Sequence, residues 1–313
     1  MVKQREFTGS ILVILAAMSW GFSGIFVRFF SALGVSTMHL TLFKVGFAGL
    51  VLLAYCLLFD RDALKVRWQD LWVFLCSGLV SMVFFTWAYF STIQATSMSA
   101  AATLLYAAPA IVMLLSALLF KEALTRRKVL ACVLAFAGCA LVSGFVGDAA
   151  PLPLRAVITG FLSALGYALY SIFGKIAIGK GYRTNTITTY TFLFAILGSL
   201  VFLRPAEIRT AALAGDSIPK FVLMAILMSV VVSLLPYMLY TNGLERVPAG
   251  KASIMASVEP VTATVVGAIA FHEIPDVFGF LGIALVLFAI ALLNLPGRSR
   301  AVRSAPSAPP ERE

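Results

Sequence analysis

The chain is a succession of apolar runs, each long enough for one membrane crossing, separated by short polar or Gly- and Pro-containing breaks. A helix rises about 1.5 Å per residue, so about 20 apolar residues cross a hydrocarbon layer roughly 30 Å thick. The pattern predicts ten such helices, at residues 8–28, 38–59, 70–91, 98–119, 127–145, 155–177, 184–203, 219–242, 250–270 and 277–295. The breaks are short except at 204–218, which leaves no room for a soluble domain.

Composition supports this interpretation, since 61% of the residues are hydrophobic and 12% are charged. Soluble domains carry roughly 25% charged residues, so this chain is predicted to be an integral membrane protein embedded in the lipid bilayer. The formal net charge is +10, but the basic residues stand singly between apolar runs and form no patch with interleaved aromatics. No nucleic-acid partner is therefore expected.

Part of the sequence occurs twice. Residues 89–125 and 240–276 align without a gap at a shift of 151 positions, with six identities in 37 positions. The identities include a proline in the middle of the segment, which is unusual in a helix interior, and a Phe-x-Glu sequence at its end. The alignment indicates an internal duplication with five predicted helices in each copy.

The distribution of basic residues predicts how the helices are oriented. If successive helices alternate in direction, 18 of the 24 Lys and Arg residues lie on the side that holds both termini. The six others are Arg28, Lys44, Arg155, Arg204, Arg209 and Lys220. Loops rich in Lys and Arg stay in the cytoplasm, so both termini are predicted to be cytoplasmic in a multi-pass protein of the cell's inner (plasma) membrane.

Five helices in each copy require the second copy to enter the membrane from the opposite face, so the repeats are predicted to be inverted. The expected fold is all-α, with ten transmembrane helices as two inverted five-helix repeats. The expected parts are a cytoplasmic N-terminus at 1–7, a first repeat at 8–145, an extracytoplasmic connection at 146–154, a second repeat at 155–295 and a disordered cytoplasmic tail at 296–313.

Three features of the chain resemble the EamA-like transporters of the drug/metabolite transporter superfamily. These are the pair Trp20-Gly21 in the first span and, in each copy, a span with a central proline that ends in an acidic residue, at 109–122 and 260–273. The resemblance covers nearly the whole chain. It implies a ten-helix transporter with two inverted repeats, and cargo such as amino acids, other metabolites or drugs.

The second span departs from the pattern of that family, whose members usually carry arginine after phenylalanine there. Here the pair is Phe43-Lys44. Lysine keeps the positive charge but lacks the planar fork that binds a carboxylate through two parallel hydrogen bonds. The resemblance therefore implies a basic residue at this position, with a different geometry of carboxylate binding.

Two charged residues are predicted to lie inside the hydrocarbon layer, where charges are costly and usually functional. Glu259 lies next to Pro260, roughly 16 Å from the outer end of its span, and Lys44 lies roughly 9 Å deep in the second span. One hypothesis is that both line a central cavity, where they pair with each other or contact a zwitterionic substrate. The alternative is that Lys44 reaches the outer headgroups and that neighbouring hydroxyls hold Glu259.

Other candidates follow from the duplication. Pro109 and Pro260 are predicted helix kinks that bracket a midplane site. Glu122 and Glu273 occur in both copies, which favours a structural role in capping or tying the following hairpin. Six aromatic side chains have small or polar neighbours, and half of them are expected to face the cavity. They are Trp20, Tyr89, Tyr106, Tyr167, Tyr170 and Tyr240.

Motifs of enzyme chemistry are missing. The sequence has no Walker loop, nucleotide fingerprint, zinc-protease motif or nucleophile elbow, and it has two histidines. No catalytic residue, metal or cofactor is therefore predicted.

The favoured function is a secondary transporter that exports a small organic metabolite, such as an amino acid or an amphipathic compound, by alternating access around a midplane cavity. The energy could come from a proton gradient acting through Glu259, or the protein could simply equilibrate its substrate without coupling. The sequence leaves the oligomeric state open. The alternative function is a membrane-embedded enzyme or a receptor-like sensor.

Overall fold

The computed structural model describes residues 2–96, 98–144, 152–214 and 217–295, and over these residues it is helical without a strand. The first half contains α1 (Val2–Gly21), α2 (Ser23–Ala32), α3 (Thr37–Phe59), η1 (Arg61–Leu64), η2 (Trp68–Asp70), α4 (Leu71–Gly78), η3 (Leu79–Phe84), α5 (Phe85–Ala95), α6 (Met98–Leu105), α7 (Ala108–Phe120) and α8 (Arg126–Val142). The second half contains α9 (Leu154–Gly179), α10 (Thr184–Leu200), α11 (Pro205–Ala214), α12 (Ile218–Ser229), η4 (Val230–Leu234), α13 (Leu235–Leu244), α14 (Ala249–Met255), α15 (Val258–Phe271) and α16 (Val277–Asn294).

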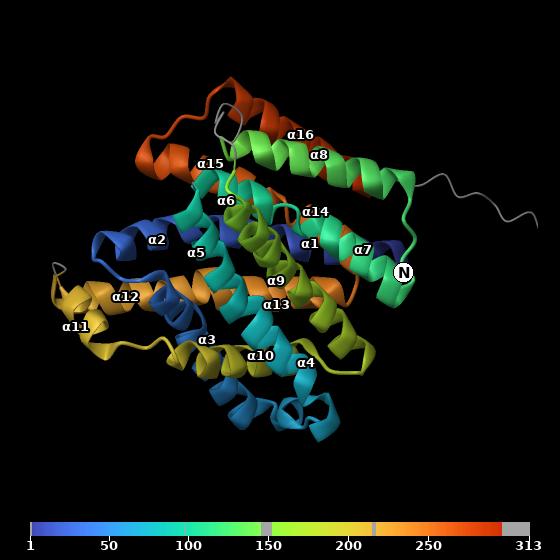
Figure 1. The fold of residues 1–313 in the computed structure, drawn as a ribbon. Helices are drawn as coiled ribbons and strands as arrows, with labels where there is room; N and C mark the ends of the chain where they lie inside the picture. The colour runs from blue at the N-terminus through green and yellow to red at the C-terminus, as the bar shows by residue number, and fades with distance from the viewer. Residues whose placement is uncertain (1, 97, 145–151, 215–216, 296–313) are drawn as a thin grey trace, which may run out of the picture.

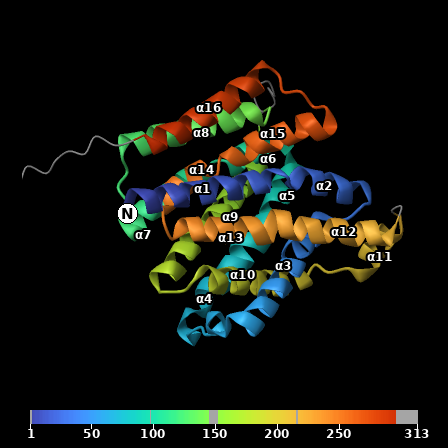
Figure 2. The same cartoon turned by 180° about the vertical axis from the view of Figure 1, so that it is seen from behind.

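The long helices lie side by side in one bundle (Figures 1 and 2). Helices α8 and α16 form one edge of it, and α3, α4 and α10 lie toward the opposite edge. Among the described residues, eight helices are long and apolar enough to cross a membrane, or nine if the bent pair α10 and α11 counts as one span. The predicted span at 127–145 corresponds to α8, which has 17 residues. The predicted tail at 296–313, and the predicted connection up to residue 151, lie outside the described residues.

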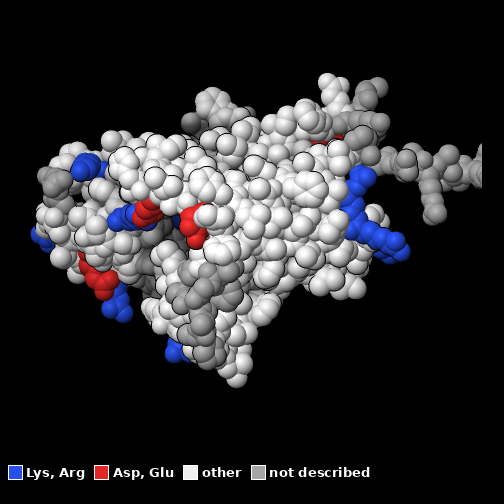
Figure 3. Space-filling model, turned by 90° about the horizontal axis from the view of Figure 1, so that it is seen from above, with Lys and Arg blue, Asp and Glu red and all other residues white. Residues whose placement is uncertain are grey.

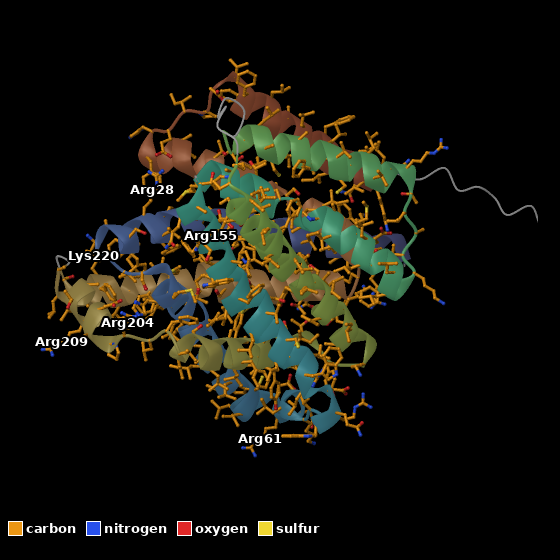
Figure 4. All side chains as sticks on the ribbon, viewed as in Figure 1. Arg28, Arg61, Arg155, Arg204, Arg209 and Lys220 are labelled. Carbon is orange, nitrogen blue, oxygen red and sulfur yellow. The ribbon has the colours of Figure 1, made fainter. Side chains whose placement is uncertain are left out.

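The surface fits a membrane environment. Figure 3 shows a wide area without charged side chains between groups of Lys, Arg, Asp and Glu toward the two ends of the molecule. Large apolar side chains such as Leu118, Ile269 and Phe288 are exposed on this bundle. In Figure 4, Arg28, Arg204, Arg209 and Lys220 lie at the end opposite the N-terminus. These four are among the six basic residues that are predicted from the sequence to lie on the side away from the termini. Their shared position at one end of the bundle agrees with that prediction.

The duplication recurs in the local geometry of the two halves. The π-helical segments η3 and η4 begin at Leu79 and Val230, and left-handed residues follow α7 and α15 at Lys121 and His272. Each pair is separated by the same 151 positions that align the two sequences. Irregular backbone at equivalent positions is independent support for two copies of one structural unit.

The two halves run in opposite directions where α8 packs against α16. The Arg127 guanidinium at the start of α8 donates to the carbonyl of Leu295, at the end of α16, over 2.6 Å. Between the ends, a Cβ atom added at Gly138 would lie 2.8 Å from the carbonyl oxygen of Gly282, and one added at Gly282 would lie 2.6 Å from that of Gly138. The two backbones thus cross in direct contact, and glycine is required on both sides.

The spans that carry the duplicated proline are broken into half-helices. A two-residue turn separates α6 from α7 and α14 from α15, and Pro109 and Pro260 lie in the first turn of the second half-helix. Proline is compatible with that position because the first N–H groups of a helix have no intrahelical partner. The break is therefore sharper than a kink in a continuous helix, and it creates a helix N-terminus inside the bundle.

Helix α11 lies within the predicted long connection at 204–218 and was not anticipated. It follows α10 at an angle of 95°. Pro205 and Glu207 in its first turn suit a helix start, since proline presets the dihedral angle and an acidic side chain favours the N-terminus. The connection therefore contains a short helix at the end of the bundle; Arg204 precedes this helix and Arg209 lies within it (Figure 4).

We expect Lys121→Gly to raise thermal stability by about 1 kcal/mol, because Lys121 ends α7 in the left-handed region at φ 55° and glycine has no Cβ penalty there. Gly181→Ala places a Cβ at φ 88° and should lower stability by a similar amount. Thermal unfolding of the detergent-purified variants measures both changes. A lower midpoint for Lys121→Gly than for the parent would contradict the assignment.

Candidate functional site

Two small cavities lie inside the helix bundle. The first holds about 250 Å³ of empty space, its open mouth included, and its lining comprises Leu105, Tyr106, Ala108, Pro109, Tyr167, Ser253, Ala256, Ser257 and Glu259. The second holds about 230 Å³ on the same measure and is lined by Thr41, Lys44, Val45, Met82, Phe85, Thr86 and Tyr237. Each cavity therefore contains one of the two charged residues that the sequence places inside the membrane.

The break before α15 positions Glu259. Its carboxylate lies in the first turn of the half-helix, where the helix dipole stabilises a negative charge. Its Oε2 atom accepts a hydrogen bond from the Tyr167 hydroxyl over 3.1 Å. The side chain is half-buried, so part of it faces the cavity. An interrupted helix thus places an acidic group where a ligand can reach it.

Lys44 lies in the first half of α3 and is also half-buried. Its cavity offers the hydroxyls of Thr86 and Tyr237 beside apolar side chains. Lys44 and Glu259 line different cavities, which are joined through the ring contact of Phe85 with Tyr167. Their placement provides one cationic and one anionic group within one region of an apolar bundle.

Aromatic rings form the wall between the two cavities. Phe85 lines the second cavity and Tyr167 lines the first, and their ring centroids lie 5.6 Å apart in an edge-to-face arrangement. Trp20 packs against Tyr167 at 6.4 Å and against Tyr237 at 5.3 Å. Tyr89 stacks on Phe85 at 6.1 Å. These rings bring together residues of both halves, and we treat the two cavities and this wall as one candidate site.

Of the six aromatic candidates, Tyr106 and Tyr167 line a cavity directly, while Trp20 and Tyr89 belong to the wall and pack against the lining rings of Tyr167 and Phe85. Tyr170 and Tyr240 are buried, at 5% and 3% exposure. The Tyr170 hydroxyl shares a hydrogen bond of 2.7 Å with Thr241, and the Tyr240 hydroxyl one of 2.8 Å with Ser171. These two tyrosines tie α9 to α13 and support the site from behind.

We expect Tyr170→Phe to lower the free energy of unfolding by about 1 kcal/mol, because it leaves the buried Thr241 hydroxyl without this partner. Tyr55→Phe removes the same hydroxyl from an exposed tyrosine of α3 and serves as the matched control. The midpoints of thermal unfolding in detergent compare the two. Equal midpoints would show that the Tyr170 bond contributes nothing.

Glu122 and Glu273 are not part of the lining of either cavity. Glu122 accepts hydrogen bonds from the N–H groups of Ala249 and Gly250, over 2.8 and 3.4 Å, at the start of α14. Glu273 forms an ion pair of 2.6 Å with Arg28 of α2. Each glutamate therefore ties a half-helix of its own half to a helix of the other half.

Among the lining residues that did not emerge from the sequence are Phe85, Thr86 and Tyr237. Tyr237 precedes Tyr240 by one helical turn and so occupies the same helix face, which was a usable signal. Phe85 and Thr86 follow η3 directly, as Tyr237 follows η4 within a few residues. Single-turn π segments occur frequently at functional sites, but hydrophobic periodicity does not reveal them.

Among the described residues, no group of three His, Cys, Asp or Glu side chains has the arrangement of a metal site. The chemical groups of the candidate site are one ammonium, one carboxylate, several hydroxyls and aromatic rings. Such groups can bind an organic ion with apolar parts through charge and ring contacts.

Comparison with known proteins identifies the family. The model of the EamA-like transporter family matches residues 7–144 and again residues 154–295. An uncharacterized transporter of Archaeoglobus fulgidus is 30% identical over 285 residues, which cover 91% of this chain and 95% of that protein. The uncharacterized inner membrane transporter YicL of Salmonella typhimurium is 26% identical, with 94% of this chain and 97% of that protein covered.

A solved crystal structure has the same fold. It superimposes with a TM-score of 0.75 at 19% sequence identity and covers 91% of this chain and 96% of its own. At this identity the likeness concerns the fold alone. The two family matches together span most of the sequence, on both sides of the connection between the halves. The chain is a member of the EamA-like transporter family.

Proposed function

We propose that this protein is a secondary transporter that exports a small organic metabolite by alternating access around the candidate site. The observation that carries the proposal is the placement of Lys44 and Glu259 in adjoining cavities of an otherwise apolar bundle. Intramembrane ionisable residues commonly mark substrate or ion pathways, because keeping them in the bilayer is costly. The rocking of the two halves would expose the cavities to each side of the membrane in turn.

The topology that goes with this function has ten spans in two inverted repeats, with both termini in the cytoplasm. The antiparallel packing of α8 on α16 and the repeated irregular segments support the inversion. Helix α8 has 17 residues and spans about 25 Å, a length that a bilayer can accommodate by local thinning. The excess of basic residues on the side of the termini supports the orientation.

The chemistry of the site favours a zwitterionic or cationic amphipathic substrate. The Lys44 ammonium would bind a carboxylate, the Glu259 carboxylate would bind an ammonium group, and Tyr106 and Tyr167 would contact the apolar part. Free amino acids with apolar side chains have these three features. Glu259 is also the group through which a proton gradient would act, since protonation of the carboxylate would remove its attraction for a cation.

Counterflow in proteoliposomes tests the proposal. Vesicles loaded with an unlabelled compound are diluted into the same compound in labelled form, with a panel of apolar amino acids and a cationic drug such as ethidium, at two external pH values. We expect accumulation of at least one compound above protein-free vesicles. Failure of every compound in the panel would contradict this substrate class, and accumulation that is the same at both pH values would remove proton coupling.

A further inference from the structure

The hydroxyl of Ser229 enters the backbone of α3 at Lys44. Its Oγ atom accepts a hydrogen bond of 2.8 Å from the N–H of Ala48 and donates one of 2.7 Å to the carbonyl oxygen of Lys44. In a regular α-helix, the N–H of one residue bonds directly to the carbonyl four residues earlier. Lys44 and Ala48 are such a pair, so a side chain from α12 bridges one rung of the α3 hydrogen-bond ladder.

This contact is buried and specific in its location. Ser229 is 0% exposed, as is Ala48. A side chain that inserts into the hydrogen-bond ladder is one of the recognised causes of helix bending, and here the insertion falls on the residue that carries the cationic group of the site. The direction in which the Lys44 side chain leaves α3 therefore depends on a hydroxyl that belongs to another helix.

The other half of the molecule has the same contact without the hydroxyl. Gly78 precedes the π segment η3 as Ser229 precedes η4, and the two positions are 151 residues apart. A Cβ atom added at Gly78 would lie 2.6 Å from the carbonyl oxygen of Thr191 and 2.8 Å from the nitrogen of Ala195, again an i, i+4 pair. Gly78 allows α4 to approach the backbone hydrogen bonds of α10 closely. At this place α10 has neither an inserted side chain nor a lysine.

The segment that carries Ser229 also shapes the cavity around Lys44. Tyr237 lies on α13, which continues from α12 through η4, and it lines the same cavity as Lys44. The Ser19 hydroxyl of α1 donates to the carbonyl of Val231 within η4 over 2.6 Å, which ties this irregular turn to a third helix. A change at η4 would therefore act on the cavity wall and on the base of Lys44 together.

We propose that Ser229 is a positioning residue for Lys44. Its inserted hydroxyl fixes the backbone at Lys44 so that the ammonium group projects into the cavity. This inference concerns the geometry of the site; only its consequence for flux rests on the proposed function. Because Gly78 takes the equivalent place, the Ser229 hydroxyl is a further feature in which the two halves differ at the site.

The geometry can be tested without knowing the substrate. Cys56, Cys76, Cys132 and Cys139 are replaced by Ala, Lys44→Cys is introduced, and its rate of reaction with a small sulfonate-bearing methanethiosulfonate is measured with and without Ser229→Ala. Loss of the Ser229 hydroxyl should slow the reaction at least about fivefold. Without it, the N–H of Ala48 bonds directly to the carbonyl of residue 44, and the side chain of residue 44 turns away from the cavity.

Ser233→Ala is the matched control for that measurement. Ser233 lies in η4, is 0% exposed, and its hydroxyl has no hydrogen-bond partner among the described residues. It should leave the rate within about twofold of the parent. Size-exclusion profiles and thermal midpoints confirm that each variant is folded. A rate for Ser229→Ala that stays within about twofold of the parent, or rises, overturns the proposal.

Counterflow of labelled phenylalanine then measures the consequence for transport. Ser229→Ala should raise the half-saturation concentration about fivefold with a smaller change in maximal rate, and should have no further effect in a Lys44→Ala background. Equal effects in both backgrounds would show that Ser229 does not act through Lys44. A changed labelling rate without phenylalanine transport by the parent would support the positioning role and count against phenylalanine as a substrate.

Discussion

Glu259→Gln is expected to lower substrate flux at least about tenfold, because a hydrogen bond to a charged group contributes about 1.5–3 kcal/mol and tenfold corresponds to about 1.4 kcal/mol. The substitution keeps the size of the side chain and leaves an oxygen that can accept from Tyr167. It removes only the negative charge. Initial rates of counterflow, at equal amounts of reconstituted protein, measure the effect.

Two controls separate transport from stability. Glu273→Gln makes the same change at the exposed end of the same span, where the carboxylate pairs with Arg28, and should leave flux within about twofold. The double variant Lys44→Met with Glu259→Gln removes both charges together. If the pair only stabilises the bundle, the double variant should regain flux, because removing one member of a buried pair costs more than removing both. The expected result is lost flux in Glu259→Gln, in Lys44→Met alone and in the double variant, with flux kept in Glu273→Gln.

Gly282→Val is expected to destabilise the protein by about 3 kcal/mol and to reduce the yield of folded material. A Cβ atom at this position would lie 2.6 Å from the carbonyl oxygen of Gly138 and 2.8 Å from the nitrogen of Val142. These are backbone atoms of α8, so a side-chain rotation cannot relieve the contact. Helices α8 and α16 would have to separate along the edge of the bundle.

Gly46→Ala provides the control for the glycine substitution. Gly46 lies within α3, and a Cβ atom added there would meet nothing within 4 Å. Alanine should therefore be tolerated or slightly stabilising, by up to about 1 kcal/mol from helix propensity. Thermal unfolding in one detergent compares the two variants with the parent. If Gly282→Val unfolds at the parent's temperature, close packing of α8 on α16 is not what holds this edge together.

Much of the architecture was predictable because one physical constraint dominates it. A helix in lipid must satisfy its own backbone and present apolar side chains, so hydrophobic runs located the helices without any packing information. The duplication was visible because Pro109 and Pro260 are rare in such runs. The turns that separate α6 from α7 and α14 from α15 were expected only as kinks. A proline in an apolar span does not reveal whether the helical backbone hydrogen bonds continue past it or end there.

The site was predictable in its charges and less so in its geometry. Lys44 and Glu259 stand out in any apolar segment because charge is expensive there. Tyr170 and Tyr240 looked the same as Tyr167 in the sequence, yet the structure buries them with hydroxyl partners on a neighbouring helix. Which tyrosine faces a cavity depends on contacts between spans, and a single sequence does not encode these in its periodicity.

The bridge from Ser229 illustrates the same limit. A serine in an apolar span usually bonds to the carbonyl of its own preceding turn, and nothing in the sequence around residue 229 indicates otherwise. The structure places its hydroxyl on α3, 185 residues away in sequence from Lys44. The interaction arises from the packing of two spans that belong to different halves.

Labelling from both sides of the membrane tests alternating access most directly. Tyr106→Cys, in a background without other cysteines, places a thiol in the cavity of Glu259. The variant is treated with an impermeant sulfonate-bearing methanethiosulfonate in right-side-out and in inside-out vesicles. Alternating access predicts that the thiol reacts from both sides, and that a transported compound slows both reactions. Reaction from one side only, in vesicles that still transport, would contradict it.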